Sequence, residues 1–122
     1  MKPEFDTEKS IYLQIAESIE DDILNEVIEE GAQVPSTNQM ASMYRINPAT
    51  SAKGINMLVS EGILYKKRGI GMFVSTGAVE KIKTKRKSAF YGKYVIPLLE
   101  EASSLGISKD DLLKMIEKSG EK

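Results

Sequence analysis

Hydrophobic residues recur at helical spacing near the start of the chain. Ile or Val occupies every fourth position from 11 to 27, and the positions between them are rich in Glu and Asp. The apolar series is Ile11, Ile15, Ile19, Ile23 and Val27. Such spacing predicts one face of an amphipathic helix. Gly31 suits the position just after a helix and Pro35 cannot continue one, so we expect the helix to end before Gly31.

A second, shorter helix is predicted from its first residues. Ser36 precedes Gln39 by three positions, which is the spacing of a capping box. We therefore expect a helix from about Thr37 to Tyr44, with Met40 buried.

A third helix is predicted a few residues later. Asn47 is a favoured N-cap, and Pro48 fits the first helical position because its missing N–H would be unpaired there. Gly62 suits the end of the helix. Its inward-facing positions share a single face and are small or apolar. They are Ser51, Gly54, Ile55, Leu58 and Val59.

Two short β patterns follow, Ile63–Tyr65 and Met72–Val74, joined by a glycine-containing connection over 66–71. They predict a hairpin. The order helix, helix, tight turn, helix and hairpin is typical of a winged helix-turn-helix. We expect this domain to span residues 1–75. The fold class is therefore mainly α with a small β-hairpin.

The remainder, residues 76–122, has a looser helical periodicity and is expected to form a helical extension. Pro97 should kink or interrupt it. Ser108, with Asp111 three positions later, predicts the start of a last helix.

Charge is distributed unevenly although the formal net charge is only −1. Residues 1–44 carry two Lys and ten acids, a balance of −8, whereas residues 45–93 carry eleven Lys or Arg and two acids, a balance of +9. A local surplus of this size indicates a polyanion as partner. The cluster Lys66, Lys67 and Arg68 lies in the hairpin. The basic run 81–87 contributes further charge or forms only a solvated helix face.

The amino-acid composition excludes several classes of catalytic and metal-binding site. The sequence has no Cys and no His, which removes thiol catalysis and the commonest general base and metal ligand. We expect no enzyme activity, no metal and no cofactor. The apolar runs are short and the first ten residues lack the core of a signal peptide, so a cytoplasmic protein without membrane association is expected.

The third helix offers candidate contacts to DNA. Recognition helices read base edges through their N-terminal residues, and here the outward positions are neutral or basic. Those positions are Ala49, Thr50, Ala52, Lys53 and Asn56. Ser36, at the start of the preceding helix, either contacts a phosphate or acts only as a cap.

These residues together resemble the winged helix-turn-helix of GntR-type bacterial transcription regulators. The likeness covers roughly Ile11–Val74 and is carried by "VPS", "INPAT" and "EGILYKKRGIGMFV" at these spacings. The short C-terminal part is similar to the YtrA-like branch, in which two helices dimerise. That branch is often linked to control of transporter operons.

The resemblance implies double-stranded DNA as partner, bound by a homodimer, with an effector that the sequence does not identify. The expected DNA-binding residues are Ser36, Asn38, Asn47, Ala49, Thr50, Ala52, Lys53, Asn56, Lys66, Lys67, Arg68, Gly69 and Gly71. The expected dimerisation residues are Phe90, Tyr94, Val95, Leu98, Leu99, Leu112 and Ile116.

Some positions differ from the usual family pattern. Asn38 stands where the family tends to have an arginine, Ala52 where it has Arg or Gln, and Met72 where it has threonine. We therefore expect the wing to carry an unusually large share of the affinity. Ser51 replaces an apolar residue, and its hydroxyl is expected to bond a carbonyl such as that of residue i−4.

Two other functions fit parts of the pattern. A winged helix can act as a protein-interaction module without sequence-specific DNA binding. The sequence Gly69-Ile70-Gly71 could instead belong to a nucleotide-binding loop. That loop requires a helix after the glycines, and here a strand-like run follows.

Overall fold

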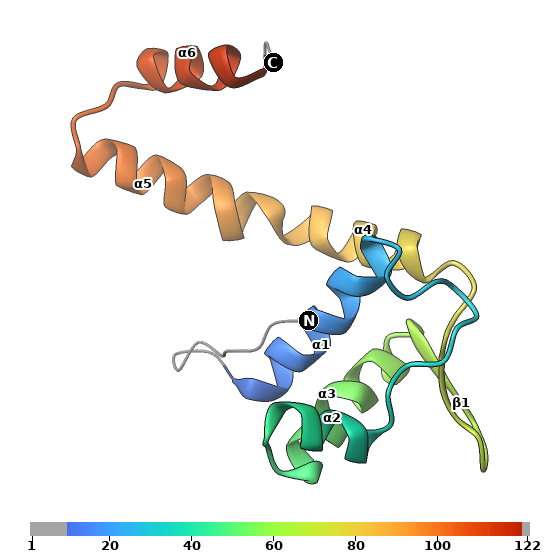
Figure 1. Ribbon diagram of the computed structural model, residues 1–122. Helices are drawn as coiled ribbons and strands as arrows, with labels where there is room; N and C mark the ends of the chain where they lie inside the picture. The colour runs from blue at the N-terminus through green and yellow to red at the C-terminus, as the bar shows by residue number, and fades with distance from the viewer. Residues whose placement is uncertain (1–9, 121–122) are drawn as a thin grey trace. The chain divides into compact units, whose positions relative to one another are not determined.

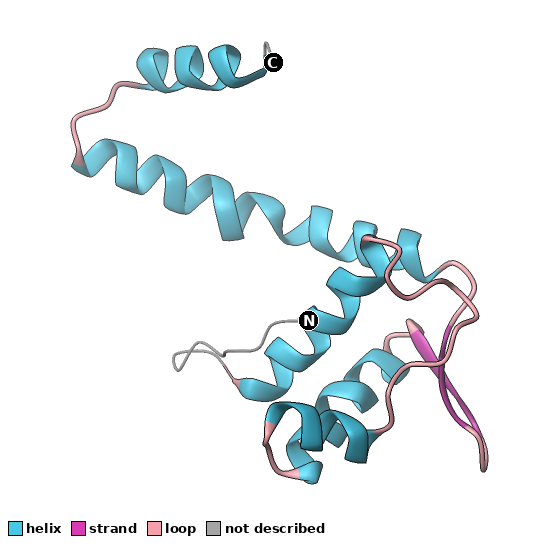
Figure 2. Cartoon of the chain, in the orientation of Figure 1, coloured by secondary structure: helices cyan, strands magenta, loops and turns pink. Residues whose placement is uncertain are grey.

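The computed structural model describes residues 10–120, and the N-terminal residues on which the expected lack of a signal peptide rested lie mostly outside the described part. By its contacts the chain divides into two compact units, 1–83 and 84–122. Figure 1 traces the elements in order and Figure 2 separates the helices from the two strands. The first helices are α1 (Ile11–Leu24), α2 (Thr37–Tyr44) and α3 (Pro48–Ser60), followed by strands β1 (Leu64–Lys67) and β2 (Gly71–Val74).

Helix α1 ends earlier than the sequence pattern predicts. It stops at Leu24, and Val27, expected on its apolar face, is 70% exposed. The backbone turns at Glu26, whose φ is +60°, and the Val27 N–H donates to the Asp22 carbonyl at 2.8 Å. This is the bonding of a Schellman motif with a non-glycine residue in the left-handed position. The prediction that Gly31 directly follows the helix was therefore wrong, because Glu26 holds that position.

The starts of α2 and α3 confirm the predicted caps. Ser36 Oγ accepts from the Gln39 N–H at 3.1 Å, and Gln39 Oε1 accepts from the Ser36 N–H at 2.8 Å. Asn47 Oδ1 accepts from the Ala49 N–H at 2.8 Å, with Pro48 at the first helical position. Gly62 follows α3 with φ +75°.

Strands β1 and β2 pair antiparallel, with Leu64 opposite Val74 and Lys67 opposite Gly71. The sheet also has a third, very short participant that the sequence analysis missed. In residues 31–34 the Val34 N–H donates to the Met72 carbonyl, and the Val74 N–H donates to the Ala32 carbonyl, at 3.0 and 2.9 Å. The segment leading into α2 is thus fastened to the wing.

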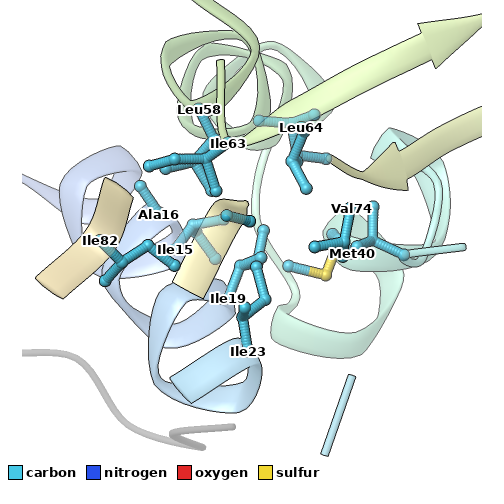
Figure 3. Close-up of a cluster of buried hydrophobic side chains, with 13 residues drawn as sticks. Ile15, Ala16, Ile19, Ile23, Met40, Leu58, Ile63, Leu64, Val74 and Ile82 are labelled. Atoms are coloured by element: carbon cyan, nitrogen blue, oxygen red, sulfur yellow. The ribbon is translucent and has the colours of Figure 1, made fainter. Parts of the chain in front are cut away.

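The core of the first unit lies between α1, α3 and the base of the wing (Figure 3). Gly54 permits α1 and α3 to approach closely, since a Cβ there would lie 2.7 Å from the Tyr12 carbonyl oxygen. Each fully buried Leu or Ile contributes roughly 1.5–3 kcal/mol. The buried cluster is Ile15, Ala16, Ile19, Ile23, Val34, Met40, Ile55, Leu58, Ile63, Leu64, Val74, Ala78 and Ile82.

The chain continues through α4 (Ala78–Phe90), the π-helical turn η1 (Tyr91–Val95), α5 (Ile96–Ser104) and α6 (Lys109–Gly120). The first part of α4 belongs to the first unit, because Ala78 and Ile82 are buried in its core. The interruption expected at Pro97 takes the form of the π-helical turn just before it. The predicted cap of the last helix is confirmed, since Ser108 Oγ accepts from the Asp111 N–H at 3.1 Å.

Candidate nucleic-acid interface

The N-terminal ends of α2 and α3 lie close together. Ser51 is fully buried, and its hydroxyl donates to the Thr37 carbonyl at 3.0 Å. Thr37 is the first residue of α2, and Ser51 lies in the first turn of α3. The acceptor expected from the sequence, a carbonyl such as that of residue i−4, was wrong. The bond instead joins two helices and brings both starts to one side of the helix-turn-helix.

The start of α2 keeps donors available. Ser36 is exposed, and its Oγ is occupied as an acceptor by the capping box. A hydroxyl carries one O–H donor besides its acceptor lone pairs, so Ser36 can cap the helix and donate to an anion at once. Asn38 is exposed in the first turn, where no acidic side chain occurs. This end of α2 is favourable for a negatively charged group.

The start of α3 presents the expected polar surface. Asn47, Ala49 and Asn56 are exposed, whereas Thr50 and Ala52 are half-buried. The Asn47 side chain uses its carbonyl oxygen for the cap and retains its amide donors. The first turn contains no acid.

Lys53 is the cation on this face of α3, and it contacts α1. Its Nζ lies 4.1 Å from the centroid of the Tyr12 ring. At this distance the ammonium is attracted by the negative face of the ring. The ring therefore restrains a side chain that the sequence analysis treated as free to reach DNA.

The basic cluster of the hairpin is divided between two faces. Lys66 and Lys67 belong to β1 rather than to the connection, which is shorter than predicted. Because side chains alternate along a strand, Lys66 and Lys67 point to opposite faces. Arg68 and Gly69 form the turn, which is closed by a 3.0 Å hydrogen bond from the Ile70 N–H to the Lys67 carbonyl.

One face of the wing carries an aromatic pair. Tyr65 and Phe73 are cross-strand partners with ring centroids 5.8 Å apart, and Lys67 Nζ lies 4.5 Å from the Phe73 centroid. Lys67 is thus held against the wing while its charge remains exposed.

Two side chains at the edges of this region, Gln33 and Glu30, were not predicted from the sequence. Gln33 Nε2 donates to the Ile70 carbonyl at 3.0 Å, which links the third sheet segment to the wing turn. Glu30 accepts from the N–H groups of Gly77 and Val79 at 2.9 and 3.1 Å, and so caps α4. Those bonds, to Gly77 first and Val79 second, hold the pKa of the Glu30 carboxyl below its ordinary value. Neither side chain carries a motif, so only the fold could reveal these contacts.

The first lysine of the basic run in α4 makes a contact that holds the fold together. Lys81 Nζ donates to the Gly62 carbonyl at 3.1 Å, just after the end of α3. A cation there complements the negative end of a helix dipole. Lys83 lies 3.9 Å from Glu80. Lys81 therefore also has a structural role, in addition to the charge that it contributes.

The C-terminal helices leave most of their large apolar side chains exposed. Of the expected dimerisation residues, Phe90, Tyr94, Leu98, Leu99 and Ile116 are exposed. Val95 is half-buried, and Leu112 is buried within the single chain at 8% exposure. Leu113 and Met115 are exposed as well and were not among the expected residues.

Within residues 10–120, no group of three acidic side chains is placed to hold a metal ion. Nor is any helix in the same part of the chain long and apolar enough to cross a membrane.

The profile of the bacterial regulatory proteins of the gntR family matches residues 11–74, more than half of the chain. The chain belongs to the GntR family. Members of this family are transcription regulators and not enzymes.

Individual relatives support the assignment over different lengths. The chain is 29% identical over 118 residues to the transcriptional regulator YhcF of Bacillus subtilis, covering 95% of this chain and 94% of that protein. It is 32% identical over 68 residues to the repressor YtrA of the same organism, covering 56% of this chain and 52% of YtrA.

Solved structures share the fold. A GntR-family regulator from Bacteroides thetaiotaomicron is 37% identical with a TM-score of 0.72, over 91% of this chain and 96% of that one. The DNA-binding domain of AraR in complex with its operator ORX1 is 29% identical with a TM-score of 0.54, over 62% of this chain and 90% of that one. The winged helix-turn-helix fold predicted from the sequence is confirmed.

Proposed function

We propose that this GntR-family regulator binds a near-palindromic operator as a homodimer and represses transcription. Residues 1–75 would contact DNA and residues 76–122 would hold the two copies together. The observation that carries the proposal is the bond between Ser51 and Thr37, which brings the starts of α2 and α3 to one side of the fold.

The two helix starts supply complementary contacts. Exposed Ser36 and Asn38 at α2 would donate to backbone phosphates and fix the register of the protein. The outward residues of α3 would enter the major groove, where Asn and Thr side chains can read base edges. AraR, whose DNA-binding domain has this fold, binds its operator, which favours the same use of the fold here.

The wing would place positive charge beside the DNA groove. Lys66, Lys67 and Arg68 are all exposed, and Gly69 and Gly71 allow the backbone to come near the duplex. Contacts of this kind neutralise phosphates, so the affinity should fall steeply as salt rises.

The tail, residues 76–122, would associate with the tail of a second copy. Two recognition helices about one turn of DNA apart, ~34 Å, require a near-palindromic site. The exposed apolar residues of α5 and α6 are suited to a self-complementary interface. Repression is favoured by the relatives named as repressors, and control of a transporter operon by the likeness to the YtrA-like branch.

Selection from a random duplex library tests the proposal without knowledge of the target gene. The expected result is an inverted repeat whose half-sites are about one helical turn apart. A parallel selection with Lys53→Glu and Arg68→Glu together should enrich nothing. Enrichment of no sequence by the intact chain would favour a protein-interaction module instead.

A further inference from the structure

The amide of Gln33 connects two parts of the proposed DNA surface. We propose that Gln33 is a positioning residue: it fixes the tip of the wing relative to the start of α2, so that wing contacts with DNA depend on it. The proposal rests on the DNA-binding function proposed above. Gln33 itself need not touch the duplex.

The backbone sets the direction of the Gln33 side chain. Gln33 forms an isolated antiparallel bridge with Phe73, and paired residues project to the same face of a sheet. From that face Nε2 reaches past Phe73 and donates to the Ile70 carbonyl at 3.0 Å. The contact is therefore made to the turn itself, beyond the last backbone bond of the 31–34 segment.

Gly71 leaves the space that the Gln33 amide occupies. A Cβ at Gly71 would lie 2.5 Å from Gln33 Nε2 and 3.5 Å from its Cδ. The φ of Gly71, +146°, also disfavours other residues. Gly71 was expected from the sequence to be a DNA-binding residue, and its proposed part is to let the backbone come near the duplex. In the structure this glycine also leaves room for the hydrogen bond from Gln33 Nε2 to the Ile70 carbonyl, hereafter the brace.

The wing tip has few other restraints. Its two strands are four residues each, and Arg68 and Ile70 at the turn are exposed. An isolated hairpin of two short strands is only marginally stable in water. Side-chain and loop ordering opposes binding, so a tip that is already fixed binds more tightly than a mobile one.

The brace also reaches the helix-turn-helix. Gln33 lies three residues before Ser36, the N-cap of α2, and Val34 between them is buried in the core. A fixed Gln33 therefore relates Arg68 at the tip to Ser36 at the proposed phosphate site. Register on the duplex requires that these contacts form together.

A double-mutant cycle on operator DNA tests the brace. Gln33→Ala should weaken binding about three- to tenfold, the range that loss of one hydrogen bond gives. In an Arg68→Ala background the same change should have a much smaller effect, because the tip no longer contributes. In a Lys53→Ala background the two losses should simply multiply. Equal losses in all three backgrounds would overturn the proposal.

A measurement on the free protein separates the brace from DNA binding. Amide exchange of Ile70, observed by NMR, should be several-fold faster in Gln33→Ala and in Gln33→Glu, which keeps the size but cannot donate. Exchange at Leu58 in the core should not change. Unchanged exchange at Ile70 would also overturn the proposal. If the intact chain bound no operator, the proposed function would fail while this measurement still decided the brace.

Discussion

The winged-helix unit and the C-terminal helices bury their apolar side chains to different extents. In the first unit most Ile and Leu residues of α1, α3 and the wing form one buried cluster, although Ile11 and Ile70 are exposed. Among the described residues after Lys83, the buried apolar side chains are Ala102 and Leu112, whereas Leu98, Leu113 and Ile116 are 44–54% exposed. The first unit buries its own apolar core, whereas the tail has an apolar surface that another surface should cover.

The difference indicates where each kind of change will act. A substitution in the first unit should alter the free energy of unfolding directly. A substitution in the tail should alter association between copies, and operator binding through it.

Among the changes considered, truncation of Leu58 should have the largest effect, and that effect is on the free energy of unfolding. Leu58→Ala removes a fully buried side chain from α3 and should lower the free energy of unfolding by about 2–5 kcal/mol. Urea unfolding followed by circular dichroism measures the loss. Met43→Ala, at an exposed apolar position of α2, should change it by no more than about 0.5 kcal/mol. Equal effects would contradict the closed core.

A charge in the tail should act on association. If the tail forms the proposed dimer, Leu98→Asp should weaken dimerisation by about 2 kcal/mol or more, because the new charge would be buried without a partner in the proposed interface. Sedimentation equilibrium measures the dissociation constant. Ser103→Asp adds the same charge at an exposed polar position of α5 and should have little effect. A dimer that tolerated Leu98→Asp would place the interface elsewhere.

Loss of the Ser51 hydroxyl should have an intermediate effect on stability. Ser51→Ala leaves the Thr37 carbonyl without its buried donor and should cost about 1–3 kcal/mol of unfolding free energy. Ser60→Ala is the matched control, since the Ser60 hydroxyl donates to the Met57 carbonyl at an exposed position. Similar decreases in melting temperature for both variants would show that the bond between α2 and α3 stabilises the fold no more than the exposed bond of Ser60 does.

The smallest effect should be the pH dependence that Glu30 confers. Bonds to the ionised form lower its folded pKa, so its contribution is present above the unfolded value of 4.5 and is lost as pH falls through the folded pKa. Glu30→Gln should therefore flatten the acid side of the stability profile and leave the neutral region less stable. Glu29→Gln is the control. Identical acid profiles for the intact chain and Glu30→Gln would contradict the cap.

Local signals made much of the fold predictable. The caps at Ser36, Asn47 and Ser108 act within three residues, so their spacing alone indicated the helix starts. The end of α1 was not predictable in this way. Its Schellman motif places Glu26 at a position that glycine usually occupies, and hydrophobic periodicity continues past the turn.

The candidate site was predictable in its residues but not in their connections. Types and spacing indicated the outward face of α3 and the basic wing. The contacts that hold them, from Ser51 to Thr37, Gln33 to Ile70 and Lys53 to Tyr12, join residues far apart in the sequence. Such contacts depend on tertiary packing, which no single segment specifies.

The most direct test of sequence-specific recognition compares the selected operator with a scrambled duplex of equal length by fluorescence anisotropy across a salt series. We expect the intact chain to bind the operator about 10³-fold or more tightly than the scrambled duplex at physiological salt. Both affinities should fall as salt rises. Equal affinity for the two duplexes would contradict sequence-specific recognition by this fold.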